Sequence, residues 1–415
     1  MTAGNTAIGT VASFNGVEPE RVAFTPDGLK AYVTNSSSHT VSVIDTQSGA
    51  QLKSIALPES NPANLAVSPD GSKVYVLNGG SSSIFIIDTK TDGLGKPSTV
   101  QNYTGTYPYG IAFNPAKGSK LAYVTNNDAA ASVSVIDTSA DSQTGTVTGY
   151  AGDQGAHGVA FAPDGKTAYV ATAKSVVAID VASGAQQQPI TGYSGITPLN
   201  IAFTPDGGKA YVTNQNSQSV SVIDTQTNTQ TGVVGKFTGS FPAVVAVTPD
   251  GATAYVTCYG TGTVSVIDVK SDTQTATVNL GEFEARQPNG VAFRPDPAAN
   301  KAGDLAYVVG HGSDSVTIVQ VPPAAAVVTS ISPSTGTVDG QTSVSISGSD
   351  LIDTTGVTFG GSAGTNLKLL SSTQLMVATP PAAGGNPGQV DVTVQNKGGS
   401  GELKGGFTYI TALAG

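Results

Sequence analysis

Side chains able to do acid–base chemistry are few in this sequence and gather at a small number of positions. The chain has three histidines, and one of them, His157, lies in the segment GAHGV. An imidazole takes up or releases a proton near neutral pH, so His157 is a candidate acid–base or ligand-contacting group. A cluster of opposite charges, Glu282, Glu284 and Arg286, closely precedes Asn289. Such a cluster is a candidate contact for a polar ligand, although solvated surface patches have the same composition.

No known catalytic motif accompanies these groups. The sequence contains no Gly-x-Ser-x-Gly nucleophile segment, phosphate-binding loop, dinucleotide fingerprint, zinc-ligand spacing or EF-hand loop. Cys258 is the only cysteine, which excludes an intrachain disulfide and predicts a small buried thiol. We therefore expect no catalytic residues, no metal site and no cofactor.

A repeated phrase determines the architecture that must position these groups. The phrase VAFTPDG…KAYVTN…TVSVIDT occupies residues 22–46 and returns, with small changes, through residue 321. Its turn proline recurs every 42 to 48 residues, at Pro26, Pro69, Pro115, Pro163, Pro205, Pro249 and Pro295. A period in the forties that carries short strand-like runs is typical of a β-propeller with one four-stranded blade per repeat. We predict an all-β fold with a seven-bladed propeller over residues 1–321.

Each repeat divides into four expected strands, A to D. Strand A is the VAF or LAV segment, followed in five repeats by a Pro-Asp-Gly turn, and strands B and C are the AYVTN and VSVIDT segments. Near-continuous apolar runs indicate strands that are buried on both faces between neighbouring blades. The large side chain that recurs in strand B is expected to pack in the core: Tyr32, Tyr75, Tyr123, Tyr169, Tyr211, Tyr255 and Tyr307.

The last repeat of the propeller lacks a strand that the N-terminal segment is able to supply. Repeat seven stops after its third strand, VTIVQV at 316–321, and is followed by Pro322-Pro323. The segment 5–14 resembles the fourth strand of repeat six, QTATVNL at 274–280. We therefore predict that residues 6–14 supply the missing outer strand of blade seven, which closes the ring and removes an open edge.

Loops that join strand D to the next strand A, and strand B to strand C, are expected to line the ligand face at the mouth of the central channel. Aligning the repeats puts Glu20, Ala63, Tyr109, His157, Leu199, Ala243 and Asn289 in one ring at this mouth. The adjacent ring is Arg21, Asn64, Gly110, Gly158, Asn200, Val244 and Gly290. From these rings and the charge cluster, the predicted binding residues are Glu20, Arg21, Tyr109, His157, Asn200, Glu284, Arg286 and Asn289.

Other recurring polar residues have simpler interpretations. His39 and His311 fall in B–C loops of blades one and seven, which become neighbours on closure, but Asp314 is the one carboxylate close by in sequence. Two solvated loop histidines are therefore expected in preference to a shared metal. The aspartates of the Pro-Asp-Gly turns and those that end strand C are expected on the opposite face, where turn chemistry accounts for them.

Beyond the propeller, residues 322–326 form an expected linker, and residues 327–415 read as a small antiparallel sandwich. Val321–Ala326 (VPPAAA) is short, stiff and extended in preference. The segments SVSISGSDL, VTFGG, QLMVATPP and QVDVTVQN alternate apolar and polar residues between Gly and Pro turns. This pattern predicts an immunoglobulin-like β-sandwich.

Composition limits the partners. The formal charge is −10, the isoelectric point is about 4.6, and charged residues make up 12% of the chain. We expect no nucleic-acid binding, because no basic stripe neutralises phosphates, and no membrane insertion, because no apolar run reaches 18 residues. A neutral, hydroxyl-rich surface is common in exported proteins. We therefore expect an extracellular or cell-surface location, with a signal peptide absent from this sequence.

The phrases AYVTN and VSVIDT at 31–46, 122–138 and 210–225 resemble the YVTN-type propeller repeats of surface-layer and periplasmic proteins. Residues 327–410 resemble an IPT/TIG domain, an immunoglobulin-like module. The matching segments are Ile331-Ser332-Pro333, Val357-Thr358-Phe359-Gly360, Thr379-Pro380-Pro381 and Phe407-Thr408-Tyr409, with Gly336 and Gly340. These resemblances imply an exported protein whose propeller presents a binding face and whose second domain acts as a spacer or adhesive unit.

Three functions are considered. The first is a non-enzymatic surface protein whose propeller face engages a glycan, a cell-wall component, a protein partner or copies of itself. The second is a secreted lyase or lactonase that uses the channel mouth through His157 with Glu20 or Glu284 and a divalent cation. The third, a redox or haem-associated propeller, implies eight blades and more histidines than the mouth offers. We favour the first function, because the mouth residues do not form a coherent reactive set.

Overall fold

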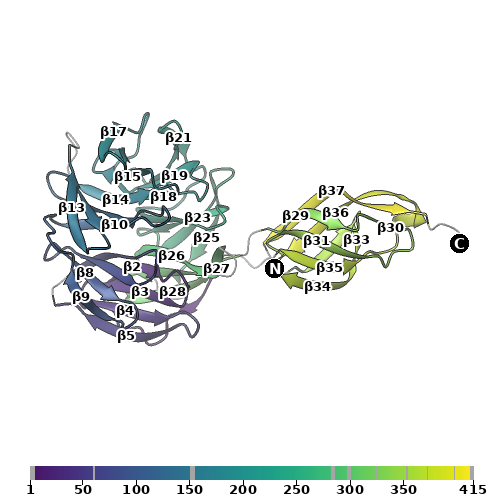
Figure 1. The fold of residues 1–415 in the computed structure, drawn as a ribbon, viewed down its shortest axis with the longest axis horizontal. Helices are drawn as coiled ribbons and strands as arrows, with labels where there is room; N and C mark the ends of the chain where they lie inside the picture. The colour runs from purple at the N-terminus through teal and green to yellow at the C-terminus, as the bar shows by residue number, and fades with distance from the viewer. Residues whose placement is uncertain are drawn as a thin grey trace. The chain divides into compact units, whose positions relative to one another are not determined.

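The computed structural model describes residues 5–58, 61–149, 155–281, 286–296, 301–322, 325–351, 354–371, 373–396 and 398–411. The chain divides into two compact units, Asn5–Gln320 and Val321–Gly415 (Figure 1). In the described ranges, no helix is both long and apolar enough to cross a membrane. The described helical segments are the short 3-10 turns η2 (His311–Ser313) and η3 (Ala383–Gly385).

The first unit is built from seven four-stranded antiparallel sheets, one per repeat, which confirms the predicted propeller. In blades one to three the strands are β2 (Pro19–Phe24), β3 (Lys30–Asn35), β4 (Thr40–Asp45), β5 (Ala50–Ala56); β6 (Pro62–Val67), β7 (Lys73–Asn78), β8 (Ser83–Asp88), β9 (Gly93–Thr99); and β10 (Pro108–Phe113), β11 (Leu121–Asn126), β12 (Val133–Asp137), β13 (Ser142–Val147). In each blade the strands pair in chain order.

Blades four to six repeat the same order. Their strands are β14 (Ala156–Phe161), β15 (Thr167–Thr172), β16 (Val176–Asp180), β17 (Ala185–Pro189); β18 (Pro198–Phe203), β19 (Lys209–Asn214), β20 (Ser219–Asp224), β21 (Thr229–Val233); and β22 (Pro242–Val247), β23 (Thr253–Cys258), β24 (Thr263–Asp268), β25 (Thr273–Asn279). The first strand of each blade is its strand A and the last is its strand D.

Blade seven is completed by the N-terminal strand, as predicted. Its sheet has the order β1-β28-β27-β26, formed by β1 (Thr6–Thr10), β28 (Ser315–Gln320), β27 (Lys301–Gly310) and β26 (Pro288–Asp296). β1 pairs antiparallel with β28, with Thr6 opposite Gln320 and Thr10 opposite Thr317. The chain then crosses to blade one, where Ala12 forms a parallel bridge with Ala50. One segment therefore joins both sides of the closing seam.

Aromatic side chains fill the space between blades. All seven strand-B tyrosines are buried, with exposed fractions of 0 to 1%. At the seam between blades seven and one, the Tyr307 ring packs edge-on against Phe24, with centroids 4.9 Å apart. Tyr123 and Phe161 pack at 4.8 Å across the seam between blades three and four. These contacts confirm that the tyrosines belong to the core, because each ring fills the wedge between two sheets.

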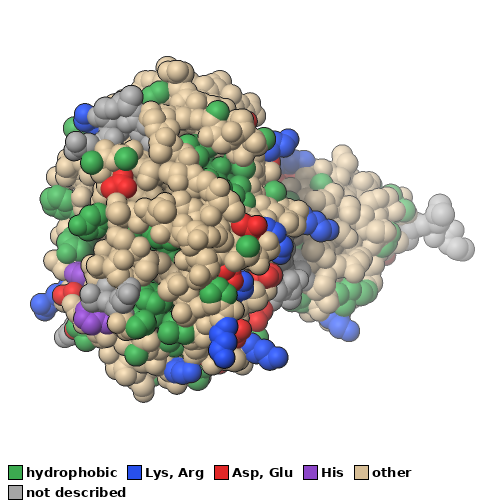
Figure 2. Space-filling view, turned by 60° about the vertical axis from the view of Figure 1, so that its left-hand side comes forward, with side chains coloured by type: hydrophobic (Ala, Val, Ile, Leu, Met, Phe, Trp, Pro, Cys, Tyr) green, Lys and Arg blue, Asp and Glu red, His purple; other side chains and the backbone are tan. Residues whose placement is uncertain are grey.

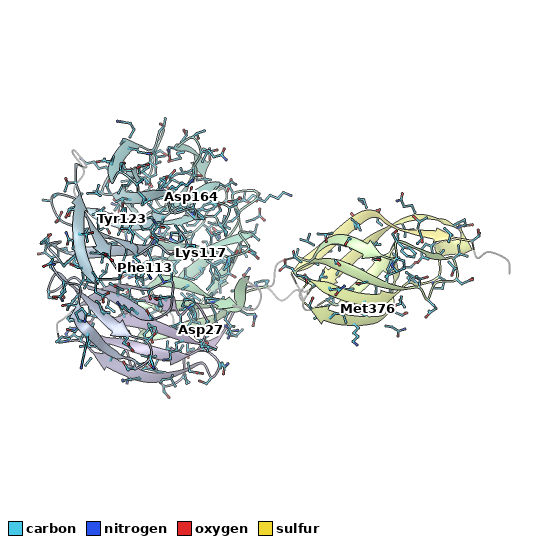
Figure 3. The ribbon with its side chains drawn as sticks, in the orientation of Figure 1. Asp27, Phe113, Lys117, Tyr123, Asp164 and Met376 are labelled. Atoms are coloured by element: carbon cyan, nitrogen blue, oxygen red, sulfur yellow. The ribbon has the colours of Figure 1, made fainter. Side chains whose placement is uncertain are left out.

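The recurring aspartates serve turns, as predicted. In the A–B turn of blade one, Asp27 Oδ1 accepts hydrogen bonds from Thr25 Oγ1 at 2.5 Å and from the Leu29 amide at 3.0 Å. Asp164 caps the equivalent turn of blade four by accepting the Lys166 amide at 2.9 Å (Figure 3). These turns leave strand A at the end away from the mouth, so their carboxylates lie on the opposite face.

The second unit is a sandwich of two sheets, which confirms the predicted immunoglobulin-like fold. One sheet has the order β29-β31-β35-β34, formed by β29 (Val327–Ser332), β31 (Ser343–Ser349), β35 (Gln374–Ala378) and β34 (Thr365–Ser371). The other has the order β30-β37-β36-β32-β33, formed by β30 (Thr335–Thr337), β37 (Gly399–Ile410), β36 (Gly388–Asn396), β32 (Gly356–Phe359) and β33 (Ser362–Ala363). Phe359, Phe407 and Leu375 are buried between the sheets, and Ala326 joins the same core.

Candidate functional site

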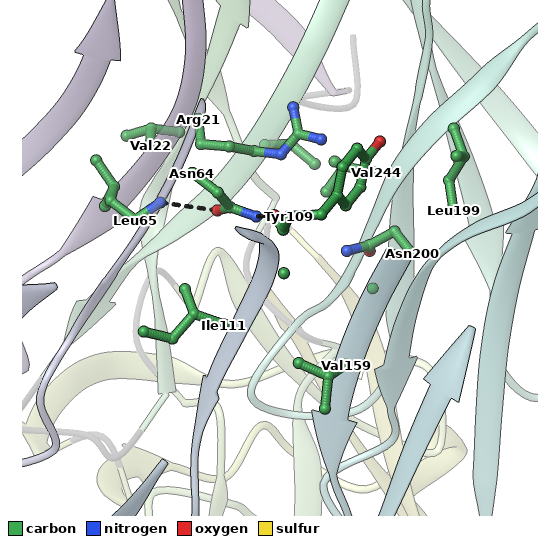
Figure 4. Close-up of a pocket in the computed structure, with 13 residues that line it drawn as sticks. Arg21, Val22, Asn64, Leu65, Tyr109, Ile111, Val159, Leu199, Asn200 and Val244 are labelled. Atoms are coloured by element: carbon green, nitrogen blue, oxygen red, sulfur yellow. Dashed lines mark hydrogen bonds between the residues drawn. The ribbon is translucent and has the colours of Figure 1, made fainter. Parts of the chain in front are cut away.

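A cavity of about 150 Å³ lies where the seven A strands converge. Its lining comes from every blade (Figure 4): Arg21, Val22, Asn64, Leu65, Tyr109, Gly110, Ile111, Gly158, Val159, Leu199, Asn200, Val244 and Val291. Arg21 is the charged member of this set, and the remainder are amides, one phenol and apolar groups. Of the predicted binding residues, Arg21, Tyr109 and Asn200 therefore line the cavity.

A bulge at the start of every strand A determines which side chains face this cavity. In blade one the register with β3 shifts between Pro19 and Arg21, and the equivalent shift occurs in the other six blades. A bulge leaves amides unpaired by the ladder. The threonine of the repeated AYVTN segment accepts them: Thr34 Oγ1 lies 3.2 Å from the Arg21 amide, and Thr213 Oγ1 lies 3.1 Å from the Asn200 amide. The repeat thus fixes the backbone of the mouth rigidly.

Arg21 is held across the seam that closes the ring. Its Nη1 donates to the backbone oxygen of Asn289 at 2.8 Å and to that of Glu20 at 2.9 Å. A guanidinium carries five N–H donors in a rigid plane, so these two bonds orient the group without exhausting its donors. Figure 4 shows the Arg21 side chain extended over the cavity.

The two asparagines of the lining tie neighbouring A strands together. Asn64 Nδ2 donates to the Tyr109 backbone oxygen at 2.9 Å, and Asn64 Oδ1 accepts the Leu65 amide at 2.8 Å. Asn200 Oδ1 accepts the Val245 amide at 3.0 Å. Asn64 is not among the predicted binding residues. Its place in the second aligned ring, equivalent to Arg21 and Asn200, is the signal that identifies it.

His157 lies beside the cavity and packs against Tyr109, with ring centroids 5.2 Å apart. Its Nδ1 lies 2.8 Å from the backbone oxygen of Pro198. Burial lowers the pKa of His157 below its usual value, and the Pro198 hydrogen bond opposes this in part. The ring is therefore neutral at pH 7, and because a carbonyl only accepts, Nδ1 carries the proton and Nε2 is the basic nitrogen.

Glu20 and Asn289 contact each other at the seam between blades seven and one and do not line the cavity. Asn289 Nδ2 donates to Glu20 Oε2. Glu20 Oε1 lies 3.2 Å from His311 Nδ1, which is buried and has no well-aligned hydrogen-bond partner. His311 was not predicted as part of this group, because sequence position alone does not show that its loop folds over Glu20.

The two remaining predicted residues contribute less. Arg286 is exposed and is not among the residues that line the cavity. Its backbone amide donates to Ser313 Oγ at 3.1 Å. Glu284, with its neighbour Glu282, lies outside the described residues. The pairing of mouth residues with that charge cluster therefore stays a prediction.

His39 and His311 face different neighbours. His39 is exposed, and its Nδ1 lies 2.8 Å from the Ser36 oxygen and 3.4 Å from the Asn61 amide of blade two. His311 instead approaches Glu20 and the Tyr259 ring, at 6.3 Å between centroids. Among the residues with described placement, no group of three or more His, Cys, Asp or Glu side chains is arranged to hold a metal ion.

Cys258 is a structural residue, as predicted. It is fully buried, and its Sγ lies 3.4 Å from Ser265 Oγ. Burial raises the pKa of the thiol above its usual value. A buried, protonated thiol is a poor nucleophile, so Cys258 takes no part in chemistry at the mouth.

Comparison with protein families agrees with this architecture. A family model described as "Lactonase, 7-bladed beta-propeller" matches residues 3–149 and 152–345. The chain belongs to this lactonase propeller family. A second model, "IPT/TIG domain", matches residues 326–409 and confirms the predicted second domain. The YVTN designation of the repeats stays a prediction. No curated protein matches the chain.

Among solved structures, one titled "Kuenenia stuttgartiensis Hydrazine Synthase" is similar to this chain, with a TM-score of 0.62 and 23% sequence identity. The match covers 74% of this chain and 96% of the other. At this level of identity the similarity shows a shared propeller fold alone. The chemistry available to this member of the lactonase family must be read from its own mouth residues: a positioned guanidinium, two amides and a phenol, with a neutral imidazole alongside.

Proposed function

We propose that this chain is a non-enzymatic binding protein of the cell surface whose propeller engages a glycan with the face that carries the channel mouth. The observation that carries this proposal is the chemistry of the cavity lining. One guanidinium and two amides are fixed by hydrogen bonds to backbone, and the rest is aromatic or apolar. Preorganised donors and acceptors around apolar walls suit a hydroxyl-rich ligand.

The arrangement of the titratable groups supports binding over turnover. Glu20 is turned to Asn289 and His311, and among the residues of described placement no carboxylate lines the cavity. Catalysis by paired acid and base groups needs both within reach of one substrate atom. In this site the carboxylate and the basic Nε2 of His157 belong to different blades.

The surface also supports a neutral polymer as partner. Figure 2 shows a wide stretch of the propeller surface with few charged side chains, while several Lys, Arg, Asp and Glu side chains gather toward the lower right of this view. With 12% charged residues, the chain has little electrostatic attraction for polyanions, and its net charge of −10 opposes them. An exported location and a spacer role for the IPT/TIG domain complete the proposal.

An array of cell-wall fragments and soluble glycans, probed with the full chain, tests this function. We expect retention of neutral glycans with micromolar affinity, and a roughly tenfold weakening by Arg21→Met, which removes the positioned donor. Lys117→Met, a change of charge on the face opposite the mouth, is the matched control. Absence of retention on every glycan by the folded chain would refute the proposal.

A second candidate, hydrolysis of a lactone, is favoured by the family match and by the neutral His157. In this mechanism Nε2 of His157 takes a proton from water while the oxygen adds to the lactone carbonyl. Arg21 would stabilise the resulting oxyanion, and the imidazolium would return the proton to the departing ring oxygen. Acid release from a panel of lactones measures this activity.

For the lactonase candidate, His157→Gln should lower turnover about a hundredfold, as expected for loss of a general base, while His39→Gln should not. Turnover that survives His157→Gln, or no turnover by the parent chain, would exclude this mechanism. Glycan binding without turnover would then leave the binding function standing alone.

A further inference from the structure

The residue before each strand A has the same unusual backbone in all seven blades. Its φ is positive, from 49° at Phe241 to 75° at Gly155. The seven positions, here called the display ring, are Glu18, Asn61, Tyr107, Gly155, Thr197, Phe241 and Gln287. Each directly precedes the first residue of strand A at the mouth.

The B–C loop holds this backbone in place in six blades. The Tyr107 oxygen accepts the Asn127 amide at 2.9 Å, and the Phe241 oxygen accepts the Tyr259 amide at 3.1 Å. The same bond is made by Glu18, Asn61, Thr197 and Gln287. Because backbone groups form it, this bond does not depend on the side chain at these positions, although the Glu18 and Thr197 side chains also accept hydrogen bonds from the B–C loop.

The side chains present are those the backbone disfavours. Left-handed φ suits glycine and asparagine, as at Gly155 and Asn61, and is unfavourable for aromatic and β-branched residues. The ring nevertheless carries Tyr107, Thr197 and Phe241. Strained residues held by an over-determined scaffold point to a function for the side chain itself.

Exposure agrees with a role in recognition. Tyr107 is 64% exposed and Phe241 is 44% exposed, although both are large and apolar. Two residues that directly precede other members of the ring are also exposed, Ile196 before Thr197 at 57% and Val17 before Glu18 at 40%. Exposed aromatic side chains on a rigid scaffold are the usual anchors of a binding surface.

The composition of the ring indicates the partner. We propose that the display ring is the recognition surface for a neutral glycan, with Tyr107 and Phe241 stacking on the C–H faces of sugar rings. Asn61, Thr197 and Gln287 offer amides and a hydroxyl for sugar hydroxyls, and Glu18 is the one charged member. This inference rests on the proposed glycan-binding function and assigns its contact residues.

A protein partner fits the ring less well. The two aromatic side chains come from blades three and six, and they are separated by Gly155 and Thr197 on one side of the ring and by Gln287, Glu18 and Asn61 on the other. A protein interface needs a contiguous apolar core, which two aromatic side chains in non-adjacent blades do not form. Single sugar rings, by contrast, use one aromatic side chain at a time with polar groups on either side.

Asparagine substitution tests the ring, because blade two already has asparagine at this position. The full-length double variant Tyr107→Asn/Phe241→Asn should fold and melt at the same or a higher temperature than the parent, since asparagine suits positive φ. It should bind a neutral cell-wall glycan on the array with a roughly tenfold or greater rise in Kd. Leu29→Asn, which replaces a 47% exposed leucine in a turn on the opposite face, is the matched control.

The outcomes separate the two proposals. Weakened binding with undiminished stability supports the ring, since a purely structural residue would lower stability when replaced. Unchanged glycan binding by the double variant overturns the ring and leaves the proposed function intact. No glycan binding by the parent chain overturns the proposed function and the glycan partner together.

Discussion

Lys30 of blade one and Asp92 of blade two lie 2.7 Å apart, from Nζ to Oδ2, across the seam between the blades. The buried Tyr32 hydroxyl donates to Oδ1 of the same carboxylate at 2.5 Å. Burial and this hydrogen bond both raise the pKa of Tyr32 well above its usual value, so the phenol stays protonated and donates. One carboxylate thus joins strand B of one blade to the C–D turn of the next.

We call the set Lys30, Tyr32 and Asp92 a seam lock. Equivalent sets lie at the other seams, and the residues at the lysine and aspartate positions differ together from seam to seam. Lysine faces aspartate in Lys73–Asp141 and Lys209–Asp272. Where the tyrosine meets an asparagine, as at Tyr169–Asn228 and Tyr255–Asn5, the lysine position holds Thr167 or Thr253. Where the aligned turn residue is a glycine, the position equivalent to Lys30 holds a leucine: Leu121 goes with Gly184, and Leu305 goes with Gly49. The two positions change together because an unpaired buried charge is costly.

The first prediction concerns the lock at Asp92. Asp92→Gly keeps a residue suited to its φ of 48°, but it removes the carboxylate that pairs with the Lys30 ammonium and accepts from the Tyr32 hydroxyl, and Lys30 keeps its bond to the Thr89 backbone oxygen. The free energy of unfolding should fall by about 2 kcal/mol, the cost of unsatisfied partly buried polar groups. Urea unfolding followed by circular dichroism measures this.

A compensating change separates pairing from general damage. Lys30→Leu/Asp92→Gly, the combination at Leu121 and Gly184, should be more stable than Asp92→Gly alone. Lys404→Met, at a 75% exposed ion pair, should leave the urea midpoint unchanged, because solvent screens such a pair. Equal losses for the single and double lock variants would show that Lys30 and Asp92 are not coupled.

The seam between blades seven and one can be stabilised by substitution. Tyr307 OH is buried, it has no hydrogen-bond partner within the described parts of the chain, and the aligned turn residue there is Gly49. Gly49 has a φ of 66°, and a Cβ added there meets only the Ile318 side chain at 3.5 Å. Gly49→Asn/Leu305→Thr should therefore supply the missing acceptor and stabilise the fold by about 1 kcal/mol. A lowered melting temperature for this variant, measured beside Gly49→Ala as the strained control, would contradict the prediction.

The pH dependence of stability should reflect the protonation of His157. Its pKa is lowered in the folded state, so the unfolded chain binds a proton more readily than the native one. Stability from this group is complete above the unfolded value of about 6.5 and declines as pH falls below it. His157→Gln should remove this decline, seen as a smaller drop in melting temperature between pH 7 and pH 5. The same drop in both proteins would place the titration elsewhere.

The thiol of Cys258 should be unreactive toward thiol reagents in the native protein. Burial raises its pKa and keeps reagents away. We expect no labelling by a thiol reagent at pH 8 over a time in which the urea-unfolded chain reacts completely. Rapid labelling of native protein would mean that blade six opens, and would reassign Cys258 as a reactive group.

The repeat made the fold predictable. Seven turn prolines, the AYVTN and VSVIDT segments and the incomplete seventh repeat together predict seven blades and a closing N-terminal strand, because each strand pairs with a neighbour close in sequence. The buried tyrosines and turn aspartates follow from the same local rules. Local hydrogen bonding and hydrophobic periodicity carry this information.

The candidate site depended on contacts that sequence spacing does not encode. Alignment puts Glu20 and Arg21 side by side at the mouth, and only the bulge after Pro19 places Arg21 in the cavity lining while Glu20 contacts Asn289 and His311. Nor does the sequence predict the display ring, because its shared feature is a positive φ that side chains such as Tyr107 and Phe241 disfavour. Closing the ring brings residues some 270 positions apart into contact, as with Arg21 and Asn289, and such contacts arise from tertiary packing.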